Sequence, residues 1–146
     1  MIVKARAVIF IDRRLIAASQ RRGGSRELSL PGGRVNRYES VLDTLKREVT
    51  EETGLEVVPR RLLYISEIVQ SVRSHDLELV FLAETTGVPT INGFKAIDLD
   101  GGERPAIRPP ILEQIVRDLA QDWRDTPRWL GNIEHLLRPT RPIGTR

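Results

Sequence analysis

Apolar residues occupy every second position from Val3 to Ile11, and some of the positions between them are apolar as well. An alternation with a period of two is typical of a strand, and apolar residues on both faces indicate that the strand is well buried. The sequence Asp12-Arg13-Arg14 should then turn the chain into a second strand over residues 15–19. We therefore expect the chain to begin with a pair of strands.

Glycine and arginine dominate residues 21–33, RRGGSRELSLPGG, which we interpret as a loop. A helix should follow this loop, because the apolar positions change to spacings of three and four residues. Ser40 is a candidate N-cap, and Gly54 with Leu55 after it is a candidate left-handed stop, so we expect the helix to end near Thr53. Its apolar stripe consists of Leu42, Leu45 and Val49.

Two further strands are expected after the helix, over residues 62–69 and 77–83, joined as a hairpin around Ser74-His75-Asp76. Residues 85–109 are rich in turn-forming residues. Pro109-Pro110 then opens a second helix, because proline is favoured where a helix begins. The buried face of this helix would consist of Ile111, Leu112, Ile115, Val116, Leu119 and Trp123.

This mixture of strands and helices predicts an α/β sandwich, with the first helix packed on a sheet and the glycine-rich loop at the edge of that sheet. With 146 residues the chain is long enough for one core and short for two. We therefore expect a single domain over residues 1–146. The last ~10 residues, from about Leu137, should form a flexible tail.

Hydrophobic residues make up 40% of the chain and charged residues 29%, without an apolar run of the ~18 residues that a membrane span needs. The N-terminus lacks a signal-peptide cleavage site, and there are no cysteines. We therefore expect a cytoplasmic protein without disulfides or thiolate metal sites, in which carboxylates and histidines are the available ligands. The balance of 23 basic and 20 acidic residues argues against a dedicated nucleic-acid binder.

Three glutamates, Glu48, Glu51 and Glu52, share one face of the predicted helix. Like charges at this spacing repel by a few tenths of a kcal/mol per pair, and the C-terminal end of a helix favours cations over anions. A bound divalent cation would remove both penalties, because it supplies positive charge and prefers oxygen ligands. From these residues alone, a metal site and a solvated acidic face are equally plausible.

The longer segment GRVNRYESVLDTLKREVTEETGL, residues 33–55, resembles the signature box of the Nudix hydrolase superfamily. That pattern has a glycine, a glutamate six positions later, and then Arg-Glu-aliphatic-any-Glu-Glu-any-Gly-aliphatic. The matching residues are Gly33, Glu39, Arg47, Glu48, Val49, Glu51, Glu52, Gly54 and Leu55. The resemblance implies a MutT-like α/β/α sandwich with a mixed β-sheet. It also implies hydrolysis of a nucleoside diphosphate linked to another moiety, with Mg²⁺ or Mn²⁺ required.

Matching positions in the box assign the metal ligands. The resemblance makes Glu48, Glu51 and Glu52 ligands of the cation, with Glu51 and Glu52 central to catalysis. Gly32 and Gly33 should let the backbone approach the metal closely, since a side chain there would obstruct it. We therefore expect Gly33 to belong to the metal site and Gly32 to contact the substrate.

Other residues are expected to assist. Glu39 would ligate a metal or accept a proton, and the planar guanidinium of Arg47 would orient one of the glutamates. Arg21 and Arg22 stand where related proteins place a phosphate-contacting arginine, although a solvated loop would explain them equally well. The general base varies in position within the superfamily. Its candidates here are Asp98, Asp100, Glu103, Glu84 and Glu78.

The substrate is less well defined by the sequence. The segment Gln70-Ser71-Val72-Arg73 has neither the proline that often marks ADP-ribose hydrolases nor the tyrosine of diadenosine polyphosphate hydrolases. ADP-ribose-like compounds are therefore less favoured, and nucleoside triphosphates, damaged nucleotides and nucleotide sugars stay open.

Two rival functions stay open at this point. A non-catalytic nucleotide-sensing domain could use the same fold, but it would be expected to lose glutamates of the box. A hydrolase directed at RNA caps or nucleic acid would need a basic groove with aromatic platforms, whereas aromatic residues make up 5% of the chain. A homodimer through the last predicted helix also stays open.

Overall fold

The structure, a computed structural model, describes residues 1–90 and 93–137. The tail that we expect from about Leu137 therefore lies, apart from Leu137 itself, outside the described residues. None of the described helices is long and apolar enough to cross a membrane. The elements in chain order are β1 (Ile2–Val8), β2 (Phe10–Ile11), β3 (Arg14–Arg22), β4 (Ser25–Ser29), β5 (Gly32–Arg34), α1 (Val41–Thr53), β6 (Val58–Ser71), β7 (Ser74–Glu84), β8 (Phe94–Asp98), α2 (Leu112–Ala120), β9 (Arg128–Asn132) and the 3₁₀ helix η1 (Glu134–Leu137).

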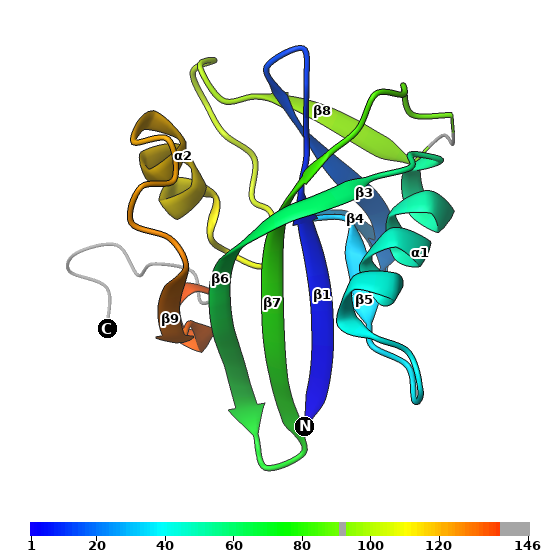
Figure 1. Ribbon diagram of the computed structural model, residues 1–146. Coiled ribbons are helices and arrows are strands. Elements are labelled where there is room, and N and C mark those ends of the chain that lie inside the picture. The colour runs from blue at the N-terminus through cyan, green and yellow to red at the C-terminus, as the bar shows by residue number, and fades with distance from the viewer. Residues whose placement is uncertain (91–92, 138–146) are drawn as a thin grey trace, which may run out of the picture.

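Two sheets carry these elements. A mixed five-stranded sheet runs in the order β5-β1-β7-β6-β9 (Figure 1). Within it β1 is parallel to β7 and β6 is parallel to β9, whereas the β1–β5 and β6–β7 pairs are antiparallel. The second sheet is built on β3, which pairs antiparallel with β2, β4 and β8. The chain crosses between the sheets at Ile9, whose carbonyl accepts the N–H of Ile16 at 2.9 Å.

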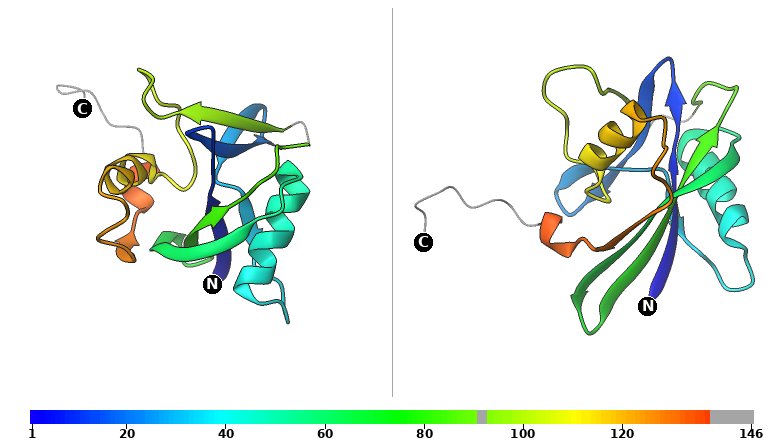
Figure 2. Two further views of the ribbon diagram at one scale, coloured as in Figure 1. Left: turned by 45° about the horizontal axis from the view of Figure 1, so that its top comes forward. Right: turned by 60° about the vertical axis from the view of Figure 1, so that its left-hand side comes forward.

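One helix covers each face of the five-stranded sheet (Figure 2). On one face, Leu45 and Val49 of α1 share a core cluster with Ala5 and Ala7 of β1, whose small side chains leave room for the helix. On the other face, Ile115 of α2 belongs to a larger cluster with side chains of β1, β6 and β7. This arrangement confirms the predicted α/β/α sandwich with a mixed sheet.

The N-terminal half contains more strand than we predicted. The alternating segment from Val3 to Ile11 is two strands, because the chain changes sheets between β1 and β2. Our interpretation of residues 21–33 as a loop was wrong, since β3 extends to Arg22 and a turn at Gly23, with a φ of 63°, leads into β4. A two-residue Gly-Gly connection favours a hairpin, because glycine accepts the positive φ that such turns need.

The C-terminal half also departs from our prediction. The hairpin of β6 and β7 turns at Val72-Arg73 rather than around Ser74-His75-Asp76. Strand β8 lies within residues 85–109, which we expected to be rich in turns, and β9 follows α2. Helix α2 was predicted, but it ends at Ala120, and Trp123 is buried from a left-handed turn with a φ of 59°.

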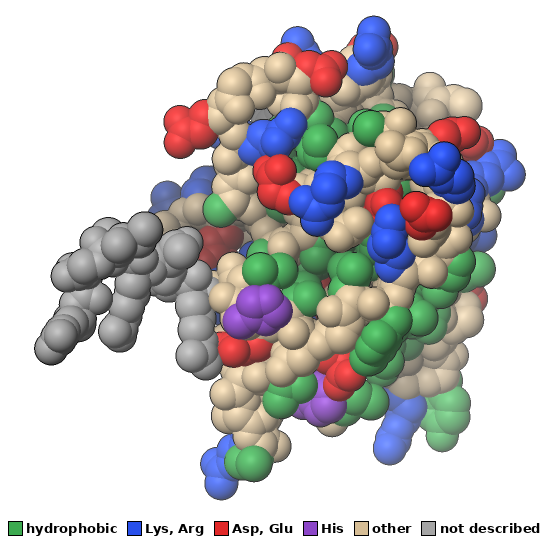
Figure 3. Space-filling model, turned by 90° about the vertical axis from the view of Figure 1, so that its left-hand side faces the viewer, with side chains coloured by type: hydrophobic (Ala, Val, Ile, Leu, Met, Phe, Trp, Pro, Cys, Tyr) green, Lys and Arg blue, Asp and Glu red, His purple; other side chains and the backbone are tan. Residues whose placement is uncertain are grey.

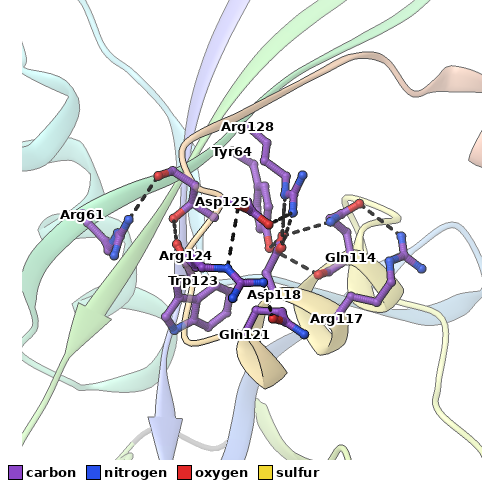
Figure 4. Close-up of polar contacts among 11 residues, drawn as sticks. Arg61, Tyr64, Gln114, Arg117, Asp118, Gln121, Trp123, Arg124, Asp125 and Arg128 are labelled. Carbon is purple, nitrogen blue, oxygen red and sulfur yellow. Dashed lines mark hydrogen bonds and ion pairs between the residues drawn. The ribbon is translucent and has the colours of Figure 1, made fainter.

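A buried polar network ties α2 to the sheet (Figure 4). Asp118 of α2 is 1% exposed and accepts hydrogen bonds from Arg128 of β9 at 2.8 Å, Tyr64 of β6 at 2.7 Å and Gln114 at 2.9 Å. Burial alone would raise the pKa of Asp118, but the donors, led by Arg128, outweigh burial and lower this pKa. The network thereby holds three elements together through one ionised carboxylate.

The outer face of α2 carries interspersed basic and acidic side chains with apolar patches between them (Figure 3). Leu119 on this helix is 40% exposed. Mixed charge of this kind is typical of a solvated surface. The homodimer through this helix, which the sequence left open, stays open.

Replacing Asp118 with asparagine should destabilise the fold. At pH 7 we expect Asp118→Asn to lower the free energy of unfolding by about 2–3 kcal/mol, because Arg128 loses its buried counter-charge while a third of its side chain keeps contact with water. Because the folded-state pKa of Asp118 is lowered, its stabilising effect is present above the unfolded pKa of about 3.9 and is lost as the pH falls below it. Urea unfolding at pH 7 and pH 3 measures this.

The matched control is Glu113→Gln, which removes an exposed carboxylate from the same helix. Its ion pair with Arg104 lies at the surface, so we expect a change below about 1 kcal/mol. A loss for Asp118→Asn that stays constant between pH 7 and pH 3 would contradict the electrostatic role of the network.

Candidate active site

The ends of α1 are set by its capping residues. The Ser40 side chain accepts the N–H of Asp43 at 3.1 Å, and Gly54 takes a left-handed φ of 78° while its N–H donates to the carbonyl of Thr50 at 2.9 Å. Both caps confirm the predicted helix boundaries. They place the glutamate cluster in the last two turns of α1, at the end that faces β5.

Glu52 is held against the backbone of β5. Its carboxylate accepts the N–H of Gly32 at 3.1 Å and the side-chain amide of Gln20 at 3.1 Å. Burial raises the pKa of Glu52 to about 7, against the hydrogen bond from Gly32 and the positive charge of Arg6, while the nearby Glu48 carboxylate adds to the increase. A positive charge beside Glu52 would therefore stabilise its ionised form.

Two glycines bring the backbone up to these carboxylates. Gly32 has a φ of 147°, and a Cβ there would overlap the carbonyl oxygen of Ala5 on β1. A Cβ on Gly33 would lie 2.6 Å from the Cδ of Glu48. Gly32 therefore requires glycine, whereas a side chain at Gly33 would displace the Glu48 carboxylate from the space that it fills.

Arg47 organises the remaining acids of the box. Its guanidinium donates to both oxygens of Glu39 at 2.8 and 2.9 Å, and to Glu48 at 3.0 Å and Glu51 at 3.3 Å. These hydrogen bonds from Arg47, with one from Thr44 at 2.6 Å, lower the pKa of Glu39 to about 2. Both oxygens of Glu39 are engaged, so Glu39 anchors Arg47 in this structure, and its metal ligation or proton transfer stays a prediction.

The donor set suits a hard divalent cation. Glu48 and Glu52 both approach the Gly32–Gly33 backbone, and carboxylate and carbonyl oxygens are the ligands that Mg²⁺ and Mn²⁺ prefer. Within residues 1–90 and 93–137, no three acidic or histidine side chains are already gathered as a metal cage. Glu51 is turned toward Arg47 and is 58% exposed, so it would have to rotate to join a cation.

A cavity of about 350 Å³ opens next to this cluster. Gln20, which bonds Glu52, lines the cavity, and so do the predicted phosphate-binding residues Arg21 and Arg22. Sequence analysis missed three further basic residues of its wall, Lys4, Arg6 and Arg108. Arg6 could have been found as a charged residue within an otherwise buried strand.

The structure separates most of the candidates for the general base from this site. Asp98 pairs with Arg14 at the start of β3. Arg14 and Gln20 are six residues apart on this strand, which is roughly 20 Å. Asp100 and Glu103 follow Asp98. Glu84 forms an exposed ion pair with Arg60 at 2.9 Å at the far end of β7, and Glu78 lines the cavity.

Comparison with known proteins identifies the family. The model of the NUDIX domain family matches residues 1–121. The chain belongs to this family. The Nudix assignment accounts for the sandwich, the glycine-rich edge of the sheet and the glutamates of α1 together, and members of the family are hydrolases that generally use divalent metals.

Solved Nudix structures share this fold. A MutT Nudix hydrolase from Burkholderia pseudomallei is 26% identical, with a TM-score of 0.66, and the match covers 77% of this chain and 96% of that one. An ADP-ribose pyrophosphatase from Streptococcus suis is 23% identical, with a TM-score of 0.66 over 90% of this chain and 97% of that one. Among curated proteins, the 8-oxo-dGDP phosphatase NUDT18 of Danio rerio is 43% identical over 58 residues, 40% of this chain and 17% of that protein.

The raised pKa of Glu52 predicts that Glu52→Gln stabilises the metal-free protein at alkaline pH. Because the folded pKa is about 7, the carboxyl of Glu52 favours the fold while it is protonated, and this contribution is lost as the pH rises from about 4.5 to above 7. Glutamine removes the charge, its Oε1 can still accept the N–H of Gly32, and its Nε2 can donate to Gln20 once the Gln20 amide turns its oxygen inward. Discounting for partial exposure, we expect the variant to gain about 1–2 kcal/mol over the wild type between pH 5 and pH 8.

Urea unfolding in the presence of a chelator measures this gain. Glu51→Gln is the control, because it removes a neighbouring carboxylate whose side chain is 58% exposed. Equal effects of Glu52→Gln at pH 5 and pH 8 would show that the fold does not oppose ionisation of Glu52.

Proposed function

We propose that this chain is a metal-dependent pyrophosphohydrolase that acts on a nucleoside diphosphate linked to another moiety. The observation that carries this proposal is the meeting of Glu48 and Glu52 with the Gly32–Gly33 backbone beside an arginine-lined cavity. A pyrophosphate brings negative charge to carboxylates that are already negative, so cations must lie between them. The cavity supplies arginines on the other side of such a ligand.

Glu48, Glu52 and the backbone of Gly33 would hold Mg²⁺ or Mn²⁺, with Glu51 as the third acid of the set. When bound, the cation would polarise a phosphoryl group and lower the pKa of an attacking water. Gln20 positions Glu52 through its hydrogen bond of 3.1 Å. The arginines of the cavity, Arg21 and Arg22 among them, would bind the phosphate oxygens that the cation leaves uncovered.

We infer that residues 1–146 act as one Nudix hydrolase domain on a small nucleotide. The relatives include an 8-oxo-dGDP phosphatase, an ADP-ribose pyrophosphatase and a UDP-X diphosphatase, all of which are named for nucleoside diphosphates or their conjugates. Nucleoside triphosphates, damaged nucleotides, nucleotide sugars and ADP-ribose-like compounds therefore make up the test panel. A cytoplasmic location agrees with such substrates.

The proposal predicts loss of turnover when either acid of the last turn is neutralised. Glu51→Gln and Glu52→Gln should each lower kcat/KM by about 10²-fold or more, because each removes a charge from the set that holds the cation and its water. The assay follows phosphate or nucleotide release across the panel with Mg²⁺ and with chelator. Glu113→Gln, on the opposite helix, should keep full activity.

Turnover that persists in chelator would contradict the metal-dependent mechanism. Nucleotide binding without turnover of any panel compound by the wild type would replace the hydrolase with a non-catalytic sensing domain.

A second prediction concerns Arg47 as a positioning residue. Arg47→Lys keeps the charge but loses the two-pronged contact with Glu39, so Glu48 and Glu51 should become less well fixed. We expect the Mg²⁺ concentration for half-maximal activity to rise about 10-fold or more while substrate KM at saturating Mg²⁺ changes little. Arg60→Lys is the matched control, because Arg60 forms an exposed ion pair. A purely structural role would leave the Mg²⁺ dependence unchanged.

A further inference from the structure

Unpartnered polar atoms gather on one wall of the cavity. Among the described residues, the buried side-chain atoms without a hydrogen-bond partner are Arg6 Nε, Ser29 Oγ, Glu78 Oε2 and Ser66 Oγ. The first three belong to residues that line the cavity beside Glu52. Leaving a buried polar atom unpaired is costly, and native proteins rarely do so without a reason. Because three of the four belong to one cavity, its wall is a place where a bound ligand could supply the missing partners.

Arg6 and Glu78 offer a donor and an acceptor side by side. The Arg6 side chain is fixed by hydrogen bonds to the carbonyls of Leu30 at 3.1 Å and Gly32 at 3.4 Å. Its Nε lies 3.6 Å from Glu78 Oε1. This distance is short enough for an ion pair but too long for a hydrogen bond. The two side chains are 12% and 3% exposed. Burial raises the pKa of Glu78 against the charges of Arg6 and Lys4, as expected of a carboxylate that has lost its water.

We propose that Arg6 and Glu78 recognise the nucleobase of the substrate by an edge that presents a carbonyl oxygen next to an N–H. The Nε–H of Arg6 would donate to the carbonyl, and Glu78 would accept from the N–H. Guanine, hypoxanthine and uracil have this edge, whereas adenine and cytosine present an amino group next to a bare ring nitrogen. Guanine adds a 2-amino donor, which the second oxygen of the Glu78 carboxylate can accept, so guanine should bind best.

The position of this pair agrees with the proposed hydrolase, on which the inference rests. Gln20 connects the cavity to Glu52, so the phosphates would lie at that end with Arg21 and Arg22. The base would lie at the wall that carries Arg6 and Glu78. A volume of about 350 Å³ is within the range of small-molecule sites. Apolar surface for the faces of a base comes from Ile68, Pro109 and Leu137.

The experiment measures binding and turnover separately. Calorimetry in Mg²⁺ gives the Kd of the α,β-methylene analogues of GDP, IDP, UDP, ADP and CDP, which cannot be hydrolysed at the bridged bond. For the wild type we expect the GDP analogue to bind at least about 10-fold more tightly than the ADP analogue, with the IDP analogue between them. This result does not depend on whether the protein has catalytic activity.

Glu78→Gln offers one acceptor and one donor in place of two acceptors. It should weaken binding of the GDP analogue and bring the ratio of the GDP and ADP constants to within about 3-fold, while the Kd for the ADP analogue stays nearly the same. Glu113→Gln is the matched control and should keep the wild-type ratio. If Glu78→Gln does not fold, Ser29→Ala removes only a hydroxyl from the same wall and should reduce the ratio by a smaller factor.

Other outcomes would overturn the inference and leave the hydrolase intact. Equal binding of all five analogues together with turnover of nucleotides would show that the wall does not discriminate between bases. A uniform fall in kcat for every substrate in Glu78→Gln, with the binding ratio unchanged, would make Glu78 a general base instead. Tight binding of nucleotide sugars irrespective of the base would assign the unpaired atoms to sugar hydroxyl groups.

Discussion

The close contact between the end of α1 and the backbone of β5 is the constraint on which the site depends. Glu52 accepts the N–H of Gly32, and the Glu48 carboxylate fills the space above Gly33. A Cβ on Gly32 would overlap the backbone of β1, and a Cβ on Gly33 would displace the Glu48 carboxylate. The two glycines therefore let β5 lie close both to β1 and to the carboxylate of Glu48. Any group that enlarged the distance between helix and strand would separate the carboxylates from the backbone oxygens that could share a cation with them.

The surroundings of α1 partly offset two unfavourable electrostatic features of this helix. The glutamates repel one another and lie at the helix end that favours cations. Arg47 offsets part of the repulsion by bonding Glu39, Glu48 and Glu51 at once, and Gly32 offsets part of it at Glu52. Burial raises the pKa of Glu52 and the charge of Glu48 adds to the increase, so ionisation of Glu52 stays unfavourable in the protein alone. The remaining deficit of positive charge is local, and it lies where the backbone and the carboxylates converge.

Sequence analysis predicted those parts of the fold that local chemistry determines. Ser40 and Gly54 cap α1 as expected, because capping depends on a few neighbouring residues. Strand β9 was missed because its pairing with β6 joins residues far apart in the chain. The general base could not be chosen from the sequence for the same reason, since Glu78 and Asp98 differ in where the sheets carry them and not in local pattern. The proposed role of Arg6 likewise depends on Glu78, which is its neighbour on β7.

Side chains alternate along β1, so the residues of the candidate site lie on both faces of one sheet. Ala5 and Ala7 face α1, and their small side chains let this helix pack close to the sheet. Lys4 and Arg6 face the cavity on the other side. A ligand on the cavity side can reach the carboxylates of α1 only around an edge of the sheet, and β5 is the edge strand there. Gly32 lies at this edge, bonded to Glu52 and adjacent to Arg6. In the proposed function, this residue without a side chain at the edge strand would let the charged groups of both faces act on one substrate.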